Sequence, residues 1–334
     1  MSEIKDFTII GGGPTGLFAA FYAGMRGLST RIVDSLPELG GQLMALYPEK
    51  YIYDVGGFPK ILAKDLSRGL IEQALQFEPE VSVDDEVRHI VRENDHFVLK
   101  ARSGDFHTRA VLVAGGRGAF EPTVLKCTGY EEFLHRGVEY AVRDPEVFRD
   151  KRVMIVGGGD SALDWALILK DICDGVFLAH RRDGWRAHAA TVELVHRASE
   201  AGEIDLRTFY EVREIHGEGT VQAVTVFDNR TDEDERLEVD AVLTFLGFKP
   251  DLGPIKEWGL ELEKNRVLVN PLMETSVPGI YAAGDIVTYE GKLDLIATGF
   301  AEAAVAANNA ARFVNPDARV NPGHSTSLAV FKDK

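Results

Sequence analysis

The stretch FTIIGGGPTGLFAAFYAGM, residues 7–25, decides the fold predicted for this chain. Its first four residues are β-prone, a glycine-rich turn follows at 11–16, and residues 17–25 are compatible with a helix. A second β-prone run at 30–33 completes a βαβ unit within about 30 residues. Strand, glycine turn, helix and strand in this order predict a Rossmann-type dinucleotide-binding unit.

Each glycine of this turn has its own task in such a unit. Gly11 permits the tight turn, Gly13 lets the backbone approach a pyrophosphate, and Gly16 lets the helix pack closely on the strand. The helix begins with free N–H groups, which favour phosphate. Asp34 lies 23 positions after Gly11, where a carboxylate accepts hydrogen bonds from ribose hydroxyls. We therefore expect FAD or NAD here, the alternative being that Asp34 is an ordinary acidic loop residue.

The same pattern returns at residues 152–179. A β-prone run at 152–156 precedes a second glycine turn, and a helix-compatible run at 163–169 and a strand at 176–179 follow. The turn supplies the candidate NADP contacts Gly157, Gly159, Asp160 and Ser161. Two copies of one unit predict two dinucleotide sites, with electron transfer between two cofactors.

The two copies differ where the ribose carboxylate is expected. The position equivalent to Asp34 is His180, and Arg181 and Arg182 follow it. Guanidinium groups bind a 2′-phosphate bidentately, and no carboxylate is present here to repel it. The second site is expected to prefer NADPH to NADH, unless these basic residues are simply solvated at a strand end.

Two crossings rich in glycine and proline, at residues 115–122 and 246–254, divide the chain into domains. We expect an α/β fold with two Rossmann-like, three-layer dinucleotide-binding domains. Residues 1–118 and 250–334 would form a discontinuous FAD-binding domain, and residues 119–249 an inserted NADP-binding domain.

The segment around the second crossing carries a further signal. Residues 221–246 are predicted to form a hairpin or meander, after which the chain continues with a strand at 279–283 and a helix at 297–313. Asp285, at the end of that strand, can bind a ribityl hydroxyl, and the N-terminus of the helix favours the negative charge of a reduced flavin. These features favour FAD in the first site, the alternative being that Asp285 is an ordinary helix or turn cap.

Composition excludes several classes of protein. The chain has 334 residues, 45% apolar and 27% charged, which is too apolar for a disordered chain. A net charge of −16 disfavours nucleic acid and anionic membranes as partners. No apolar run reaches the ~18 residues of a membrane span, and the N-terminus does not resemble a secretory signal, so a cytoplasmic enzyme is expected.

Neither a disulfide framework nor a metal site is expected. The two cysteines, Cys127 and Cys173, are 46 positions apart, so the chain has no CxxC pair. His188 and His196 are eight positions apart, with no Asp or Cys to complete a metal set. We therefore predict redox chemistry that depends on bound organic cofactors.

Six motifs together resemble those of one enzyme family. They are GGGPTG (11–16), GGQLMALYPEKYIYDVGGFP (40–59), GGGDSALDWA (157–166), HRRDGWRAH (180–188), YAAGD (281–285) and HSTS (324–327). Over essentially its whole length the chain is similar to ferredoxin–NADP⁺ reductases of the thioredoxin-reductase-like type. The resemblance implies a homodimeric flavoprotein with one FAD per subunit, working between NADP(H) and ferredoxin or a flavodoxin-like carrier.

The resemblance also implies individual contacts. The FAD contacts that it assigns are Thr15, Asp34, Gln42, Tyr47, Val87, Phe120, Asp285 and Thr326. It places Tyr47 and His324 on the two faces of the flavin ring, and it implies no side chain as an acid–base catalyst. Thioredoxin reductases carry a CxxC pair before the second glycine turn, whereas residues 141–144 here are AVRD. Disulfide chemistry is therefore not expected at that position.

Two other functions remain open. One is an NADPH-dependent flavin enzyme that reduces another carrier, such as flavodoxin, a quinone or a disulfide protein. The net charge of −16 favours this alternative, because an acidic ferredoxin would be repelled. The other is a flavin-binding redox sensor without significant turnover. Bleaching of the flavin by NADPH, followed by reoxidation with ferredoxin, separates the three functions.

Overall fold

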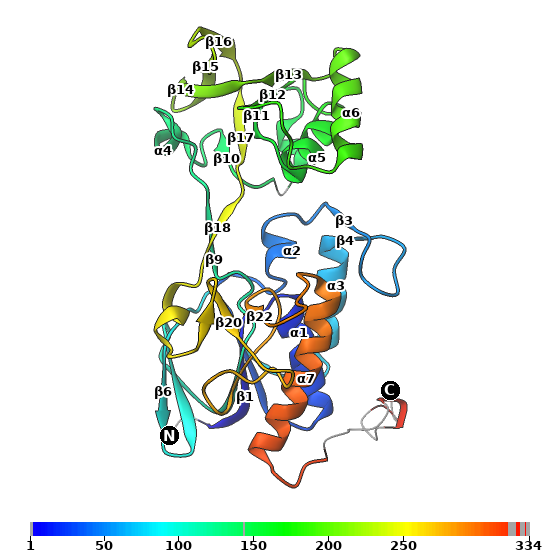
Figure 1. Ribbon diagram of the computed structural model, residues 1–334, viewed down its shortest axis with the longest axis vertical. Coiled ribbons are helices and arrows are strands. Elements are labelled where there is room, and N and C mark those ends of the chain that lie inside the picture. Colours follow the sequence, from blue (N-terminus) through cyan, green and yellow to red (C-terminus); the bar gives the residue numbers. More distant parts are fainter. Residues whose placement is uncertain (1–2, 143, 320–324, 328–330, 332–334) are drawn as a thin grey trace. The chain divides into compact units, whose positions relative to one another are not determined.

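A computed structural model describes residues 3–142, 144–319, 325–327 and 331. The chain folds into two compact units (Figure 1), unit 1 comprising Met1–Phe120 and Pro250–Lys334, and unit 2 comprising Glu121–Lys249. The chain passes between the units in β9 (Ala119–Pro122) and β18 (Phe248–Asp251), which pair with each other. Both units combine parallel strands with helices, so the predicted α/β class is confirmed.

Unit 1 is built on a sheet with the strand order β5-β2-β1-β8-β7-β6. The bounds are β1 (Lys5–Ile10), β2 (Thr30–Val33), β5 (Glu80–Ser82), β6 (Val87–Glu93), β7 (His96–Ala101) and β8 (Asp105–Val113). The first half of β8 pairs antiparallel with β7, and its second half pairs in parallel with β21 (Ile280–Ala282). A strand from the C-terminal part of unit 1 therefore joins the sheet beside β8, which also pairs with β1.

Three helices cover one face of this sheet (Figure 1). They are α1 (Pro14–Met25), α3 (Ala63–Leu75) and α7 (Ile296–Val314). α1 packs against both α3 and α7, and the small buried side chains of Ala19, Ala20 and Ala23 allow close packing around it. The shorter elements are α2 (Gln42–Ala45), β3 (Tyr51–Ile52), β4 (Ile61–Leu62), η2 (Gly253–Glu257), β19 (Leu262–Glu263), β20 (Arg266–Leu268), β22 (Val287–Thr288) and η3 (Ser325–Ser327).

Unit 2 has three layers around a parallel sheet with the order β10-β17-β11-β12-β13. The bounds are α4 (Tyr130–Phe133), β10 (Val138–Glu139), η1 (Pro145–Phe148), β11 (Arg152–Gly157), α5 (Asp160–Leu169), β12 (Gly175–His180), α6 (Ala189–Glu200), β13 (Asp205–Thr208), β14 (Tyr210–Glu218), β15 (Thr220–Asp228), β16 (Asp234–Glu238) and β17 (Ala241–Phe245). Along β11, Val153 and Ile155 belong to the core shared with α5 and α6, whereas Met154 and Val156 belong to the core shared with the β14-β15-β16 sheet. Successive side chains of a strand point to opposite faces, so one apolar strand supplies both cores.

The segment predicted as a hairpin or meander divides between two sheets. β15 and β16 pair antiparallel with each other and with β14, a strand that the sequence did not predict. β17 instead pairs in parallel with β11, which corrects the prediction for the last part of residues 221–246. Residues 241–244 are buried, as is typical of an inner strand covered on both faces.

Candidate cofactor sites

The first glycine turn joins β1 to α1 through backbone that is packed too closely for side chains. A Cβ at Gly16 would lie 1.8 Å from the carbonyl oxygen of Gly11, and a Cβ at Gly11, whose φ is +111°, would lie 2.4 Å from that of Ala114. Gly13 caps α1, and the first turn of the helix, which begins at Pro14, contains no acidic residue. The positive end of the helix is therefore unopposed, which fits a pyrophosphate.

Asp34 follows β2 directly and is held beside this turn. Its carboxylate accepts hydrogen bonds from the backbone N–H groups of Gly12 and Leu36, and the residue is 7% exposed. Burial raises the pKa of Asp34 above its ordinary value, and the two N–H groups counteract part of that rise. A carboxylate oriented in this way fits the ribose contact predicted from the sequence, which stays a prediction.

A second turn, at Gly284 and Asp285, follows β21 in unit 1. Gly284 has a φ of +86°, and a Cβ there would lie 2.8 Å from Oγ1 of Thr15. A Cβ at Gly299, in the first turns of α7, would lie 2.4 Å from the same hydroxyl oxygen. Thr15 therefore lies where the beginnings of α1 and α7 meet this turn. The structure brings Thr15 next to Gly284, the residue before Asp285, although the two are far apart in the sequence.

Asp285 lies in a group of alternating charges. Nε of Arg117 is 3.9 Å from Asp285, Nη2 of Arg117 is 2.9 Å from Asp294, and Arg266 donates two hydrogen bonds of 2.7 Å to Asp294. Burial, and then the charge of Asp294, raises the pKa of Asp285, whereas the hydrogen bonds from Arg266 lower the pKa of Asp294. Asp285 is thus the less neutralised and only partly buried carboxylate, which fits a group that accepts from a ligand hydroxyl.

Gln42 and Tyr47 lie close to the same residues. A Cβ at Gly41, just before Gln42, would lie 2.8 Å from Cα of Gly13, so this segment touches the first glycine turn. Burial, followed by the charge of Asp285, raises the pKa of Tyr47 to about 12, so its phenol keeps its proton at neutral pH. The structure therefore gathers Gln42 and Tyr47 with the other contacts predicted for FAD.

The structure shows less of the surroundings of four residues that are predicted to contact FAD. Val87 begins β6 and is 5% exposed, which leaves mainly its backbone for a ligand. Thr326 is exposed in η3, and no described hydrogen bond links it to the site. His324 and the side chain of Phe120 lie outside the described residues. All four remain predictions from the resemblance.

The second glycine turn, in unit 2, is tied to the loop that follows β12. The backbone N–H of Arg186 donates to the carbonyl oxygen of Gly158 at 2.9 Å. The N–H of His188 donates at 2.9 Å to the carboxylate of Asp160, the first residue of α5. These two bonds hold the loop over the turn. A dinucleotide that binds to the turn would therefore meet the loop's side chains.

His180 is buried beneath this loop. A Cβ at Gly158 would lie 2.0 Å from its ring, Trp185 stacks on it with ring centroids 4.4 Å apart, and Nε2 is 3.0 Å from the carbonyl oxygen of Gly184. Burial lowers the pKa of His180, and the charges of the two following arginines lower it further. The structure therefore gives His180 the position of a largely neutral support for the loop, while its predicted contact with NADP stays a prediction.

The loop carries three exposed arginines, Arg181, Arg182 and Arg186, which form no ion pair within the described part of the chain. Asn229 fixes the loop by donating to the carbonyl oxygen of Arg181 at 2.8 Å. Other arginines of unit 2 are paired with carboxylates, such as Arg213 with Asp232 and Asp234. Guanidinium groups without carboxylate partners fit a 2′-phosphate. The sequence analysis did not assign Arg186 or Asn229, although HRRDGWR already contained Arg186.

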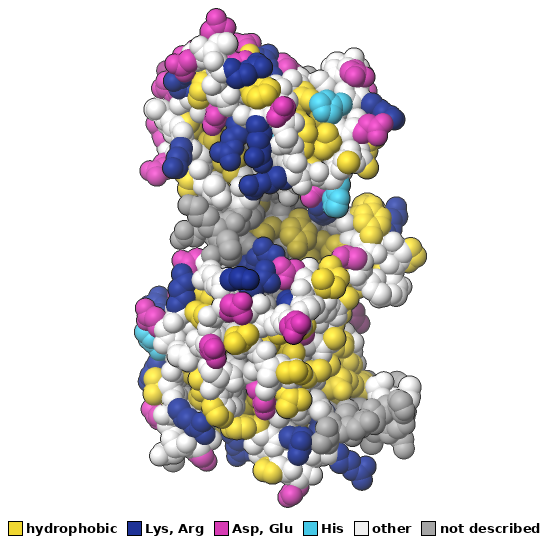
Figure 2. Space-filling model, in the orientation of Figure 1, with side chains coloured by type: hydrophobic (Ala, Val, Ile, Leu, Met, Phe, Trp, Pro, Cys, Tyr) yellow, Lys and Arg dark blue, Asp and Glu magenta, His cyan; other side chains and the backbone are white. Residues whose placement is uncertain are grey.

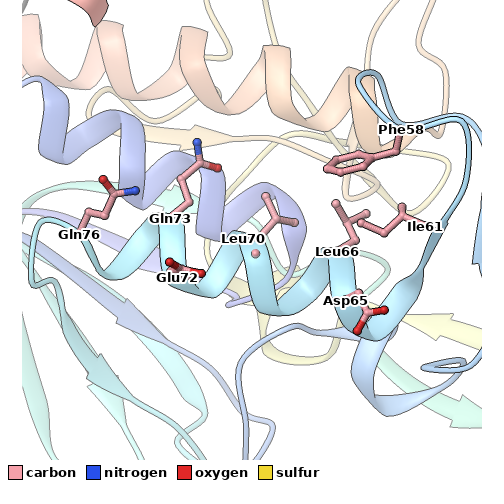
Figure 3. A pocket seen from close by; sticks show the side chains of 9 residues that line it. Phe58, Ile61, Asp65, Leu66, Leu70, Glu72, Gln73 and Gln76 are labelled. Carbon is pink, nitrogen blue, oxygen red and sulfur yellow. The ribbon is translucent and has the colours of Figure 1, made fainter. Parts of the chain in front are cut away.

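A pocket elsewhere in unit 1 contains none of these residues. It has a volume of about 360 Å³ and lies on the outer side of α3, where Leu66 and Leu70 face Phe58 and Ile61 (Figure 3). Among the residues that the structure describes, no group of three or more His, Cys, Asp or Glu side chains could hold a metal ion. Within the same ranges, no helix has the length and apolar character needed to cross a bilayer.

The fold and the two sites define a two-domain, dinucleotide-binding oxidoreductase. The chain belongs to the family described as pyridine nucleotide-disulphide oxidoreductases, whose model matches residues 5–310. FAD and NADP(H) are its cofactors. The residues of the two sites fit these groups, because unit 1 holds the Asp34 carboxylate beside its glycine turn and unit 2 offers arginines that have no carboxylate partner among the described residues.

Relatives and solved structures agree with this placement. The chain is 54% identical over 329 residues to a ferredoxin–NADP reductase of Thermus thermophilus and 50% identical over 328 residues to one of Halalkalibacterium halodurans, with 98% of each chain covered. It is also similar to the crystal structure of thioredoxin reductase from T. acidophilum, with a TM-score of 0.78, 26% identity and coverage of 92% and 97%. It is similar as well to the crystal structure of thioredoxin reductase from Lactococcus lactis, with a TM-score of 0.77 and 28% identity. That comparison covers 93% of this chain and 99% of the other.

Proposed function

We propose that this chain is a ferredoxin–NADP reductase that binds FAD in unit 1 and NADP(H) in unit 2. The observation that carries the proposal is the 54% identity, over 98% of both chains, with a relative of that name. The unpaired arginines after β12 support a phosphorylated nicotinamide nucleotide. We further propose, from the resemblance, a homodimer in the cytoplasm.

The two cysteines favour a carrier that is not a disulfide. Cys127 and Cys173 are both free, and burial raises the pKa of each to about 11. Disulfide exchange needs a thiolate, and a thiol with so high a pKa supplies little of it at neutral pH. Residues 141–144 contain no cysteine. The thiol chemistry in the family's description therefore has no support in this chain.

Positioning is the main contribution that the protein's residues make to the reaction. Bound FAD would supply the chemistry that links the electron pair of NADPH to the single electrons of an iron–sulfur carrier. The two glycine turns would bind the pyrophosphates, Asp34 and Asp285 would accept hydrogen bonds from hydroxyl groups, and the arginine loop would bind the 2′-phosphate. Tyr47, as a neutral phenol, would exclude water from the flavin ring without adding charge. Correct placement of reacting groups supplies much of the rate in such a transfer.

Electrostatics bears on the choice of carrier. The net charge of −16 opposes an acidic partner at long range. Acidic and basic side chains are nevertheless interspersed on the drawn face, and Lys and Arg side chains gather locally on each unit (Figure 2). The Debye length is only ~8 Å at physiological ionic strength, so such local groups can attract an acidic carrier at contact distance.

A side-by-side assay tests the proposal. The purified holoenzyme is reduced with NADPH without oxygen, and flavin absorbance is followed while ferredoxin, flavodoxin or thioredoxin is added. We expect bleaching by NADPH, slower bleaching by NADH, and reoxidation that is fastest with ferredoxin. Bleaching without reoxidation by ferredoxin would contradict the proposal. A bound flavin that NADPH does not bleach would instead support the redox sensor.

The second candidate is a reductase for a less acidic carrier. The net charge of −16 favours it, because two strongly negative proteins associate slowly. Ionic strength separates the candidates. Added salt should slow the reaction with ferredoxin if local basic groups attract it, whereas salt should speed a reaction that repulsion limits.

A further inference from the structure

A buried ion pair lies behind the turn at Gly284 and Asp285. Nζ of Lys292 is 2.6 Å from Oε1 of Glu302, and the two side chains are 4% and 3% exposed. Other ion pairs of unit 1 keep at least one side chain more exposed, such as Glu80 at 44% in its pair with Arg31 and Glu49 at 31% in its pair with Lys64. The sequence analysis assigned no role to either residue.

Every described hydrogen bond of the Glu302 carboxylate comes from a donor in unit 1. Oε1 accepts from the hydroxyl of Tyr289 at 2.6 Å and from Nζ of Lys292 at 2.6 Å, and Oε2 accepts from the backbone N–H of Gly284 at 2.7 Å. Burial, together with the hydrogen bond to Glu302, raises the pKa of Tyr289 to about 12, so this hydroxyl remains a donor. The carboxylate thus links the turn, the segment after β22 and α7.

Stability alone does not account for such a pair. Removing two charges from water costs several kcal/mol per ion, and apolar residues of similar volume often stabilise a protein as well or better. A buried charge pair is therefore informative about what it holds in place. Here the charge-assisted hydrogen bond from Gly284 restricts the backbone immediately before Asp285.

The pair also connects two features of the site in unit 1. Glu302 lies in the second turn of α7, so its bond to Gly284 fixes Asp285 relative to the beginning of that helix. The positive charge of Lys292 acts on Asp285 as well and counteracts part of the rise in its pKa. A shift of about 1 Å in a positioning group is enough to lose much of its effect.

We infer that Glu302 is a positioning residue for FAD: its carboxylate holds the N–H of Gly284, and thereby aims Asp285 at the cofactor, while Lys292 balances its charge. The inference rests on the proposed FAD site in unit 1. Neither Glu302 nor Lys292 needs to touch the cofactor, and the effect reaches it through the backbone of the turn.

The test measures FAD affinity rather than turnover. Glu302→Gln, Lys292→Met and the double variant are prepared as holoenzymes, and FAD release on dilution is followed by flavin fluorescence between pH 6 and 9. Glu302→Gln should weaken binding about tenfold at every pH, the worth of one charge-assisted hydrogen bond. Lys292→Met should make binding depend on pH, weaker at low pH, where the unpaired buried carboxyl takes up a proton. The double variant should lose that dependence.

Controls separate positioning from loss of fold. Asp105→Asn removes the exposed ion pair between Asp105 and Lys100, which has the same length of 2.6 Å. This variant should leave FAD affinity unchanged. Circular dichroism reports folding, and if Lys292→Met does not fold, Glu302→Gln still tests the inference. Wild-type affinity in Glu302→Gln, or a pH-independent Lys292→Met, would overturn it. A wild-type protein that binds FAD but does not reduce ferredoxin would overturn only the proposed function.

Discussion

The two glycine turns of this chain, GGGPTG and GGGDSA, differ at their sixth position. In unit 1 this position is Gly16, and a Cβ there would lie 1.8 Å from the carbonyl oxygen of Gly11. In unit 2 it is Ala162, whose methyl group is fully buried. The strand and helix of the first turn therefore lie too close together for a methyl group that the second turn accommodates. The first turn is the more tightly packed of the two.

The residues after the second strand of each unit extend this difference. Asp34 faces the first turn and receives two backbone N–H groups, so its negative charge is fixed in position. Arg181 and Arg182 are exposed and unpaired within the described ranges, so their positive charges can follow a ligand. One site is preorganised, and the other can adapt. This agrees with a cofactor that stays bound and a substrate that must leave at each turnover.

The largest effect is expected from Gly16→Ala. The added methyl group would overlap the carbonyl oxygen of Gly11, and relief requires α1 to move away from β1. We expect a loss of at least ~3 kcal/mol in unfolding free energy and no bound FAD, measured by denaturant titration and flavin absorbance. Gly69→Ala in α3 is the matched control, because a Cβ there meets nothing within 4 Å. Full FAD content in Gly16→Ala would contradict the tight packing of the first turn.

Removing both arginines should have the next largest effect. We expect Arg181→Ala with Arg182→Ala to raise KM for NADPH about 100-fold, since each charge-assisted hydrogen bond contributes ~1.5–3 kcal/mol. KM for NADH should stay the same, because NADH has no 2′-phosphate. Steady-state kinetics with both nucleotides measures this, and Arg213→Ala, an arginine already paired with Asp232, is the control. Equal losses with both nucleotides would show that the arginines act on something other than the phosphate.

Local patterns were sufficient to predict the βαβ units and the α/β class. The order of β1, the glycine turn and α1 follows from sequence alone, because glycine, β-branched and small residues act within a few positions. β17 was placed in the wrong sheet because AVLTF is compatible with an edge or an inner strand, and only its pairing with β11 decides. Pairing over 80 residues or more depends on tertiary packing that periodicity does not encode.

Candidate site residues could be chosen from the sequence where a motif or its spacing marks them, but not where the fold brings together groups that belong to no motif. Arg181 and Arg182 followed from their distance to the second turn. Glu302 could not, because its partner Gly284 is a backbone donor on another element. His180 was predicted as an NADP contact from its position after the second strand, and the sequence did not show that it is buried under Trp185. Burial is a property of the folded chain, so single residues do not reveal it.

Gly158→Ala tests whether the second turn is the more adaptable. The methyl group would displace the ring of His180, which in turn supports the loop through Gly184. Because a side chain can yield, we expect a loss of only ~1 kcal/mol in stability and a rise of about tenfold in KM for NADPH. FAD content should not change, because the first turn lies in unit 1. Unfolding as severe as in Gly16→Ala would remove the contrast between the turns.

The smallest effect concerns the charge of Asp285, and its sign follows from the direction of its pKa. Burial raises that pKa above 3.8, so the folded apoprotein binds the proton more tightly than the unfolded chain does. Stability from this group is present below pH 3.8 and is lost as pH rises through the folded pKa. Asp285→Asn should therefore raise the unfolding free energy of the apoprotein at pH 7 by about 0.5 kcal/mol, while it weakens FAD binding. Chemical denaturation at pH 4 and pH 7 measures the difference, which should shrink at the lower pH. A variant that is less stable than wild type at pH 7 would show that the carboxylate serves the fold and not the cofactor.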